Sequence, residues 1–389
     1  MNLQLKIRRW DWLLIVGAML APMTGLRIWK IGPAEVMCFL WALRYISLRS
    51  IRFNFLSKFF TVFIFCMFLG TLICSNVAPE EVRLESWPTW IFLVVISCVL
   101  LRVVEQNDLN YNIKVFDLIC RFSTLWYALL YVFSRTVSRS FLGAPLWYYY
   151  RYAGGGTNPH QLAVLMCGIA FWYIYKFSQR RKIVDIVFFL LTLFLLSETK
   201  SSTGIAAIAV GVFVYVAIWL IESGRSSTQK AVFLSMEFLV IIMTITLFYR
   251  QLFQMAYEWV SEDANGLGRF YIWSSFKQAI MKSPLVGLGP GTHGISYYGI
   301  KEFHNSYLEI FAASGVIGFI AFIVLTIIII KKVIKGYPKL LPIIVAMYGY
   351  SMAGFAFRRL AYWVVMIFTI VIAEQIGGNR PGKEAGLIT

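Results

Sequence analysis

Stretches of roughly 20 apolar residues recur along the whole chain and restrict what it can fold into. Each stretch is long enough to cross the hydrocarbon core of a bilayer, which is about 30 Å thick. Hydrophobic residues make up 59% of the 389 positions, more than a soluble domain carries. The sequence therefore predicts an all-α, polytopic membrane protein. We expect about twelve transmembrane helices, at residues 11–26, 31–48, 59–76, 87–106, 113–134, 159–178, 183–198, 203–222, 231–250, 305–331, 340–357 and 360–376.

These spans divide the chain into four parts. Residues 1–250 hold the first nine predicted helices, 251–304 form a long connection, 305–376 hold the last three helices, and 377–389 form a polar tail. An even number of spans places both termini on the same side of the membrane. The first apolar run follows Lys6, Arg8 and Arg9 and has no small-residue cleavage site after it, so we interpret it as a retained span.

The formal charge of +17 is distributed unevenly over the predicted connections. One set of connections is short and basic, which by the positive-inside rule makes that side cytoplasmic. In a bacterial inner membrane the two long connections, about 135–158 and 251–304, then face the periplasm. This distribution explains most of the charge without nucleic acid as a partner. The basic positions are Lys6, Arg8, Arg9, Arg49, Arg52, Lys58, Lys176, Arg180, Arg181, Lys182, Arg225, Lys230, Lys331, Lys332, Lys335 and Lys339.

The cysteines and acidic residues give no sign of a metal or cofactor. All six cysteines fall inside apolar runs and none forms a CxxC pair, which argues against a disulfide framework or a thiolate metal site. The predicted outer connections contain neither a DxD nor an HExxH motif. We expect the protein to act without a metal.

A group of arginines on the predicted outer side is not explained by the positive-inside rule. A guanidinium group can bind two phosphate oxygens at once, so outer arginines suit an anionic ligand. Solvated loop charges and contacts with lipid headgroups are the alternative interpretation. The group consists of Arg135, Arg139, Arg151, Arg269, Arg358 and Arg359.

The segment from Gly268 to Gly294 contains an amphipathic pattern followed by a glycine-rich turn. Aromatic and apolar residues recur at helical spacing and predict a helix that lies in the membrane interface and stops at Pro284. The GLGPGTHG sequence follows this helix rather than a strand, so we interpret it as a reversal of the chain and not as a nucleotide-binding loop. The helix pattern includes Arg269, Phe270, Trp273, Phe276, Lys277 and Ile280.

Three polar positions flank predicted spans on the outer side. Asn305 is a good N-cap for an unbroken apolar helix, in which Gly315 and Gly318 allow close packing. His304 before it is either a polar cap or a general base, because an imidazole can accept a proton from a hydroxyl at neutral pH. Lys200 lies in a short turn between two spans. The segment that leads into the span at 159–178 adds Arg151, Asn158 and His160.

These motifs resemble the O-antigen ligase and O-antigen polymerase superfamily of membrane glycosyltransferases. The similarity rests on His304-Asn305 followed by the GVIG sequence at 315–318, on Gly268-Arg269 with Trp273, and on Pro284 with Gly287 and Gly289. The resemblance implies transfer of a glycan from undecaprenyl pyrophosphate at the periplasmic face, without a metal or nucleotide. It implies His304 as the essential histidine and Arg269 as the outer-loop arginine. A second family arginine is replaced here by Lys200, which keeps the charge but not the two-pronged geometry.

The acceptor distinguishes the possible functions. A polymerase transfers the glycan to a lipid-linked repeat unit, a ligase transfers it to lipid A-core, and a protein-directed oligosaccharyltransferase is a further alternative. The NPHQLA and ETKSS sequences are more similar to the polymerase branch, whose other partners are membrane lipids and a chain-length regulator. A transporter of lipid-linked sugars is another alternative, but it would favour charges within the spans and a symmetric repeat, and the sequence shows neither clearly; Arg121 is the main charge within a span. The expected substrate contacts beyond His304, Arg269 and Lys200 are Arg135, Arg139, Arg151, Asn158, His160, Lys277 and Asn305.

Overall fold

The computed structural model describes most of the chain, and helices dominate it. The described residues are 6–28, 31–46, 54–79, 82–222, 273–274, 276–291, 303–352, 354 and 356–379, with isolated positions between 226 and 243. The helices are α1 (Asp11–Leu20), α2 (Pro33–Ile46), α3 (Phe55–Val77), α4 (Trp87–Gln106), α5 (Leu109–Thr136), α6 (His160–Arg180), α7 (Ile183–Glu198), α8 (Ser202–Glu222), α11 (Phe276–Lys282), α12 (Ser306–Gly336), α13 (Leu341–Ser351) and α14 (Leu360–Gly378).

Seven of these helices are long and apolar enough to cross a membrane. They are α3, α4 with the 3-10 turn before it, α5, α6, α8, α12 and α14, whereas α1, α2, α7 and α13 are shorter. The predicted all-α membrane fold is confirmed, but the count of twelve spans is not. The predicted span at 231–250 lies mostly outside the described residues.

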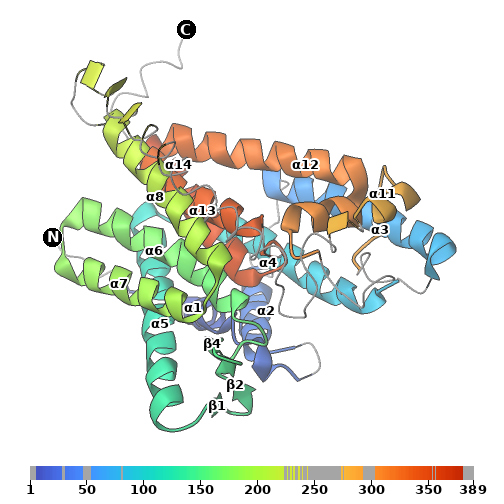
Figure 1. Cartoon of the computed structure of the whole chain (residues 1–389), viewed down its shortest axis with the longest axis horizontal. Coiled ribbons are helices and arrows are strands. Elements are labelled where there is room, and N and C mark those ends of the chain that lie inside the picture. Colours follow the sequence, from blue (N-terminus) through green and yellow to red (C-terminus); the bar gives the residue numbers. More distant parts are fainter. Residues whose placement is uncertain are drawn as a thin grey trace.

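Two helices, α6 and α14, form the centre of the bundle. They are the most enclosed of the long helices, with 83% and 78% of their most apolar windows buried. Helix α6 packs against α7, α8 and α13, and α14 packs against α4, α5 and α12. Figure 1 shows α3 and α12 side by side, with α11 next to them. These packing contacts join helices that lie far apart in the sequence, such as α3 and α12 or α4 and α14.

A cluster of charges links α5, α6 and α7. Arg121 forms ion pairs with Asp117 at 3.1 Å and with Asp185 at 3.3 Å, and Lys176 pairs with Asp117 at 2.9 Å. Lys176 is buried inside α6 and does not lie in a basic connection as the sequence suggested. Charges in an apolar environment need partners, so this cluster explains the mid-span Arg121 as an interhelical contact.

Helix α12 breaks at Gly315, which corrects the prediction of an unbroken helix. Gly315 has φ 64° and ψ −166°, a backbone conformation that is essentially limited to glycine. The segment 284–289 fills the break and satisfies the backbone groups that the helix leaves open. Leu288 N and Gly289 N donate to the carbonyls of Ala312 and Ala313, and Val316 N and Ile317 N donate to those of Pro284 and Leu285.

The glycine-rich segment is therefore packed between helices instead of only reversing the chain. A Cβ at Gly287 would lie 2.5 Å from the carbonyl carbon of Ala313, and a Cβ at Gly70 of α3 would lie 2.6 Å from Gly289 N. Gly287 and Gly289 both have positive φ angles. Glycines at these positions allow the segment to approach α3 and α12 at backbone distance.

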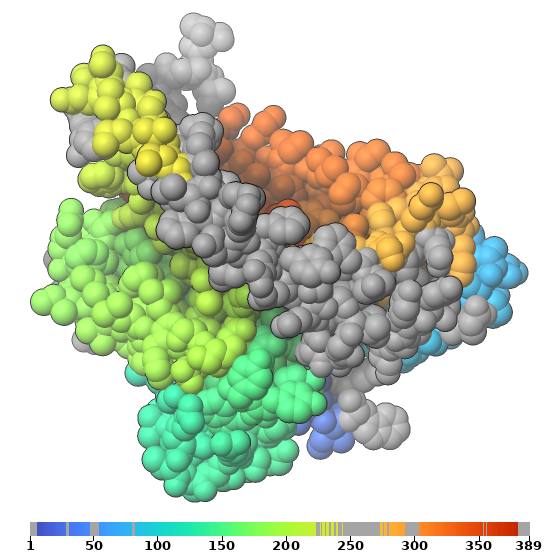
Figure 2. All heavy atoms as spheres, in the orientation of Figure 1, coloured from blue at the N-terminus to red at the C-terminus, as the bar shows by residue number. Residues whose placement is uncertain are grey.

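Two short hairpins follow α5. Strand β1 (Ser140–Phe141) pairs with β2 (Ala144–Pro145), and β3 (Trp147–Tyr148) pairs with β4 (Arg151–Tyr152). Figure 2 shows that the end of α5 and these hairpins form a lobe that projects from the helical body. The Tyr152 hydroxyl donates to Tyr127 O at 2.7 Å, and burial raises the pKa of Tyr152 well above its ordinary value. Tyr152 thereby fixes β4 against α5 as a neutral donor.

Candidate functional site

The ends of several helices meet at one face of the bundle, which we call the site face. Helices α1, α5, α7 and α13 end there, and α2, α6, α8, α12 and α14 begin there. Contacts between the connecting segments establish this arrangement, since Gly25 N donates to Gly155 O at 2.9 Å and Arg151 Nε donates to Thr199 O at 3.0 Å. Several of the predicted outer positions that the structure describes, among them Lys200, His160 and His304, border these ends.

His160 is the centre of a polar cluster at the site face. Its Nδ1 lies 3.0 Å from the hydroxyl of Tyr350 and 3.2 Å from that of Ser201, and its Nε2 lies 3.4 Å from Nη2 of Arg151. Asn158 fixes the start of α6 by accepting a hydrogen bond from His160 N at 2.9 Å. The cluster, which we call the His160 cluster, joins β4, α6, α13 and the α7–α8 turn.

Lys200 lies in the α7–α8 turn beside this cluster. Its φ of 49° places it in the left-handed region, which costs a non-glycine residue free energy. Its ammonium lies 4.0 Å from Glu198, and Arg135 lies 3.4 Å from the same carboxylate. The side chain of Lys200 is 53% exposed, so the ammonium group remains accessible to an anion from solvent.

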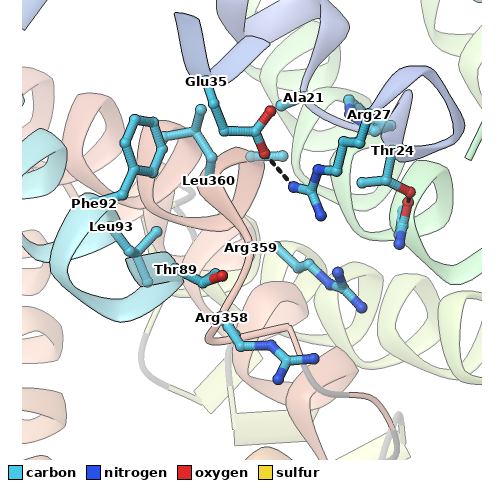
Figure 3. Close-up of a pocket in the computed structure, with 13 residues that line it drawn as sticks. Ala21, Thr24, Arg27, Glu35, Thr89, Phe92, Leu93, Arg358, Arg359 and Leu360 are labelled. Atoms are coloured by element: carbon cyan, nitrogen blue, oxygen red, sulfur yellow. Dashed lines mark hydrogen bonds and ion pairs between the residues drawn. The ribbon is translucent and has the colours of Figure 1, made fainter. Parts of the chain in front are cut away.

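A second group of cations lines a small pocket at the site face. Arg27, Arg358 and Arg359 contribute to its wall, together with Glu35 and Gln161, and its cavity volume is about 30 Å³. Figure 3 shows Arg27 paired with Glu35, while Arg358 and Arg359 extend from the segment before α14. Three arginines and one carboxylate leave two positive charges in excess. We call this the arginine pocket.

The arginine pocket adjoins the His160 cluster. When the side-chain amide of Gln161 is oriented with its nitrogen toward Pro22 O, its oxygen accepts a hydrogen bond from Arg359 Nη1 at 3.3 Å. The residue before Gln161 in α6 is His160, which contacts Arg151 and Tyr350. The two groups thus form one cationic region around the start of α6.

His304 is held by the backbone on both sides of it. Phe303 N donates to the carboxylate of Glu309, and Phe303 O accepts from Trp273 Nε1 at 3.0 Å. Asn305 caps α12 as predicted, because its side chain accepts from Tyr307 N and Leu308 N. His304 itself adopts a φ of 52°, so it shares the left-handed conformation of Lys200. Strained residues of this kind are often found at functional sites.

The start of α12 is tied to the segment that carries the arginines. Ser306 Oγ donates to Gly354 O at 2.7 Å and accepts from Ala356 N at 3.1 Å. Arg358 and Arg359 follow these positions by only a few residues. The histidine and the arginine pocket therefore lie at the same end of the bundle.

Only some of the predicted substrate-contact residues lie together in the structure. Arg151, His160, Asn158 and Lys200 come together, whereas Arg139 and Lys277 are exposed, and within the described residues no contact joins them to the His160 cluster. Arg135 stacks on Trp147 at 4.3 Å and pairs with Glu198. Arg269 lies outside the described residues. Trp273, which is described, has helical conformation just before α11, and α11 ends before Pro284 as predicted.

Sequence reasoning did not identify Arg27, Gln161, Ser201 or Tyr350. Arg27 follows the first predicted span and belongs to the outer side by the same topology that singled out Arg358 and Arg359. Its position after the first predicted span was therefore enough to include Arg27 among the outer arginines. Tyr350 lies inside an apolar span, where only the fold shows that its hydroxyl reaches His160.

Residues 186–323 match the family model of the O-antigen ligases. This segment of the chain is similar to the O-antigen ligase family. The predicted resemblance is thereby confirmed over a segment that begins in α7, includes Lys200 and His304, and ends in α12 beyond Gly315. No curated protein sequence matches the chain. The match supports an enzyme of the O-antigen ligase or polymerase type, in a multi-pass membrane protein.

Proposed function

We propose that this O-antigen ligase-type protein transfers a glycan from undecaprenyl pyrophosphate to a hydroxyl group of an acceptor at the periplasmic face of a bacterial inner membrane. The observation that carries the proposal is the position of His304 and Lys200 within the family domain, at the same face as the arginine pocket. A base and several cations at one membrane face suit a reaction whose leaving group is a lipid pyrophosphate.

In the proposed reaction His304 accepts the proton of the acceptor hydroxyl. The hydroxyl oxygen forms a bond to the anomeric carbon of the glycan, and the bond between that carbon and the pyrophosphate oxygen breaks. The electron pair leaves with the pyrophosphate, whose increased negative charge Lys200, Arg269 and the arginine pocket stabilise. In-line attack of this kind inverts the anomeric centre.

The distribution of charge supports the proposed orientation. The opposite ends of the helices carry a dense set of basic residues, which the positive-inside rule assigns to the cytoplasm together with both termini. The site face then lies in the periplasm. The basic residues of these opposite ends include Arg180, Arg181, Lys182, Lys331, Lys332, Lys335 and Lys339.

We favour polymerisation of lipid-linked repeat units over ligation to lipid A-core. The two sequences that resemble the polymerase branch contribute His160, Lys200 and Ser201, which border one cluster in the fold. The description of the matching family, O-antigen ligase, favours the alternative. Purified protein incubated with a lipid-linked repeat unit alone separates the two. A ladder of products supports the polymerase, and transfer that requires added lipid A-core supports the ligase. Absence of transfer under both conditions would contradict the proposed function.

A further inference from the structure

A larger, apolar groove continues from the arginine pocket along α2 and α4. Its cavity volume is about 390 Å³, within the range of small-molecule sites in proteins. It shares Arg27, Glu35, Thr89 and Phe92 with the arginine pocket. The remaining wall is formed by Ile31, Val36, Phe39, Leu40 and Pro88.

The groove is divided into a polar end and an apolar part. All three of its polar lining residues, Arg27, Glu35 and Thr89, are those that it shares with the arginine pocket. On α2 the apolar wall extends from Val36 to Leu40, a length of about 6 Å along the helix. Val36, Phe39 and Leu40 are each nearly half exposed, so the groove opens sideways toward the lipid.

This arrangement matches the chemistry of one kind of ligand. Phosphate groups suit the excess positive charge of the arginine pocket, and an unbranched or branched hydrocarbon chain attached to them suits the adjacent groove. The geometry points to a binding site for a polyprenyl pyrophosphate, with its head at Arg27, Arg358 and Arg359 and its first isoprene units between α2 and α4. The inference rests on the proposed function, because it names where the lipid of that reaction is held.

Selectivity for this lipid must come from the head group and the shape of the groove. Bilayer tails are as apolar as the groove, so moving a tail from the bilayer into it gains no hydrophobic free energy. Two excess positive charges favour a pyrophosphate over the single charge of an ordinary anionic phospholipid. A bilayer phospholipid is therefore the competing occupant that an experiment has to distinguish.

Photo-crosslinking of the purified full-length protein tests the site without requiring turnover. The probe is undecaprenyl pyrophosphate with a diazirine in the isoprene unit next to the head. We expect the label on α2 and α4, at Val36, Phe39 or Phe92, and we expect excess unlabelled undecaprenyl pyrophosphate to suppress it. Phosphatidylglycerol at the same excess should not. Labelling elsewhere, or equal suppression by phosphatidylglycerol, would overturn the inference.

A matched pair of variants tests the groove itself. Val36→Trp fills the groove, whereas Leu43→Trp adds the same side chain at a similarly exposed position of α2 outside it. We expect Val36→Trp to weaken binding of undecaprenyl pyrophosphate by about tenfold, which corresponds to about 1.4 kcal/mol, because the indole ring would occupy the space proposed for the isoprene units. Binding of inorganic pyrophosphate, which has no tail, should be unchanged in both variants.

The two proposals fail in different ways. If the wild-type protein is labelled in the groove but transfers no glycan, the proposed function fails and the lipid site stands. If the protein transfers glycan while Val36→Trp and Leu43→Trp bind the lipid equally well, the lipid site is wrong and the proposed function stands.

Discussion

The break in α12 makes Gly315→Ala an informative substitution, because a broken and a continuous helix predict opposite effects. In a continuous helix alanine is favoured over glycine by about 1 kcal/mol. At Gly315, with φ 64° and ψ −166°, any side chain is strained by about 1–3 kcal/mol. The new Cβ would also lie 2.3 Å from the carbonyl of Leu285, where nonbonded contact requires about 3.5 Å.

The magnitude follows from the contacts that must yield. To relieve the overlap, the segment 284–289 has to retreat by about 1 Å. This movement lengthens four backbone hydrogen bonds that now measure 2.9, 3.0, 2.9 and 3.1 Å. Each such bond contributes about 1 kcal/mol, so loss of the four bonds together with the backbone strain gives an expected destabilisation of about 5–7 kcal/mol.

The assay is unfolding of the purified protein in mixed micelles, followed by tryptophan fluorescence. Gly349→Ala is the matched control, because Gly349 lies within α13 and a Cβ there would meet only Ala207 Cα at 3.8 Å. We expect the control to change the free energy of unfolding by less than about 1 kcal/mol. A Gly315→Ala variant as stable as the wild type, or more stable, would refute the inserted segment and the break.

Three further substitutions test the site. Glu309→Ala removes the acceptor of Phe303 N and should lower kcat about tenfold with KM unchanged, while Glu309→Gln should restore part of the rate. Glu222→Ala is the control, because the Glu222 carboxylate pairs with Lys339 at the opposite end of the helix bundle. An equal loss of kcat in the control would contradict the role of Glu309 in positioning His304. Lys200→Gly relieves the strain of the left-handed backbone, so the protein should be as stable as the wild type or up to about 1 kcal/mol more stable. The same substitution removes a cation and should lower the transfer rate about 100-fold. Loss of stability without loss of rate would refute the role of Lys200 in stabilising the leaving group. Arg269→Lys keeps the charge and loses two-pronged binding, so the KM for the donor should rise, and an unchanged rate would remove Arg269 from the site.

Hydropathy was sufficient to locate most of the helices. Apolar length alone identified α3 to α8, α12 and α14 close to their observed bounds, because a membrane requires a minimum run of apolar residues. The break at Gly315 could not be found this way. The residues on both sides are apolar, and the backbone groups at the break are satisfied by a segment about 30 positions earlier in the sequence.

Topology was also enough to bring part of the site together. Placing Lys200, His160 and Arg151 on one side of the membrane predicted their neighbourhood, because helix ends on one face are confined to a thin layer. Which of them touch depends on how the helices pack. Tyr350 reaches His160 across 190 positions, and such a pairing leaves no pattern in a single sequence.

The role of His304 is the centre of the proposed mechanism, and one measurement tests it most directly. The purified His304→Ala variant is compared with the wild type for glycan transfer from undecaprenyl pyrophosphate-linked repeat units, and for binding of undecaprenyl pyrophosphate. Loss of a general base should lower the transfer rate about 100-fold or more, with binding unchanged within about twofold. A variant that keeps the full transfer rate would contradict the mechanism.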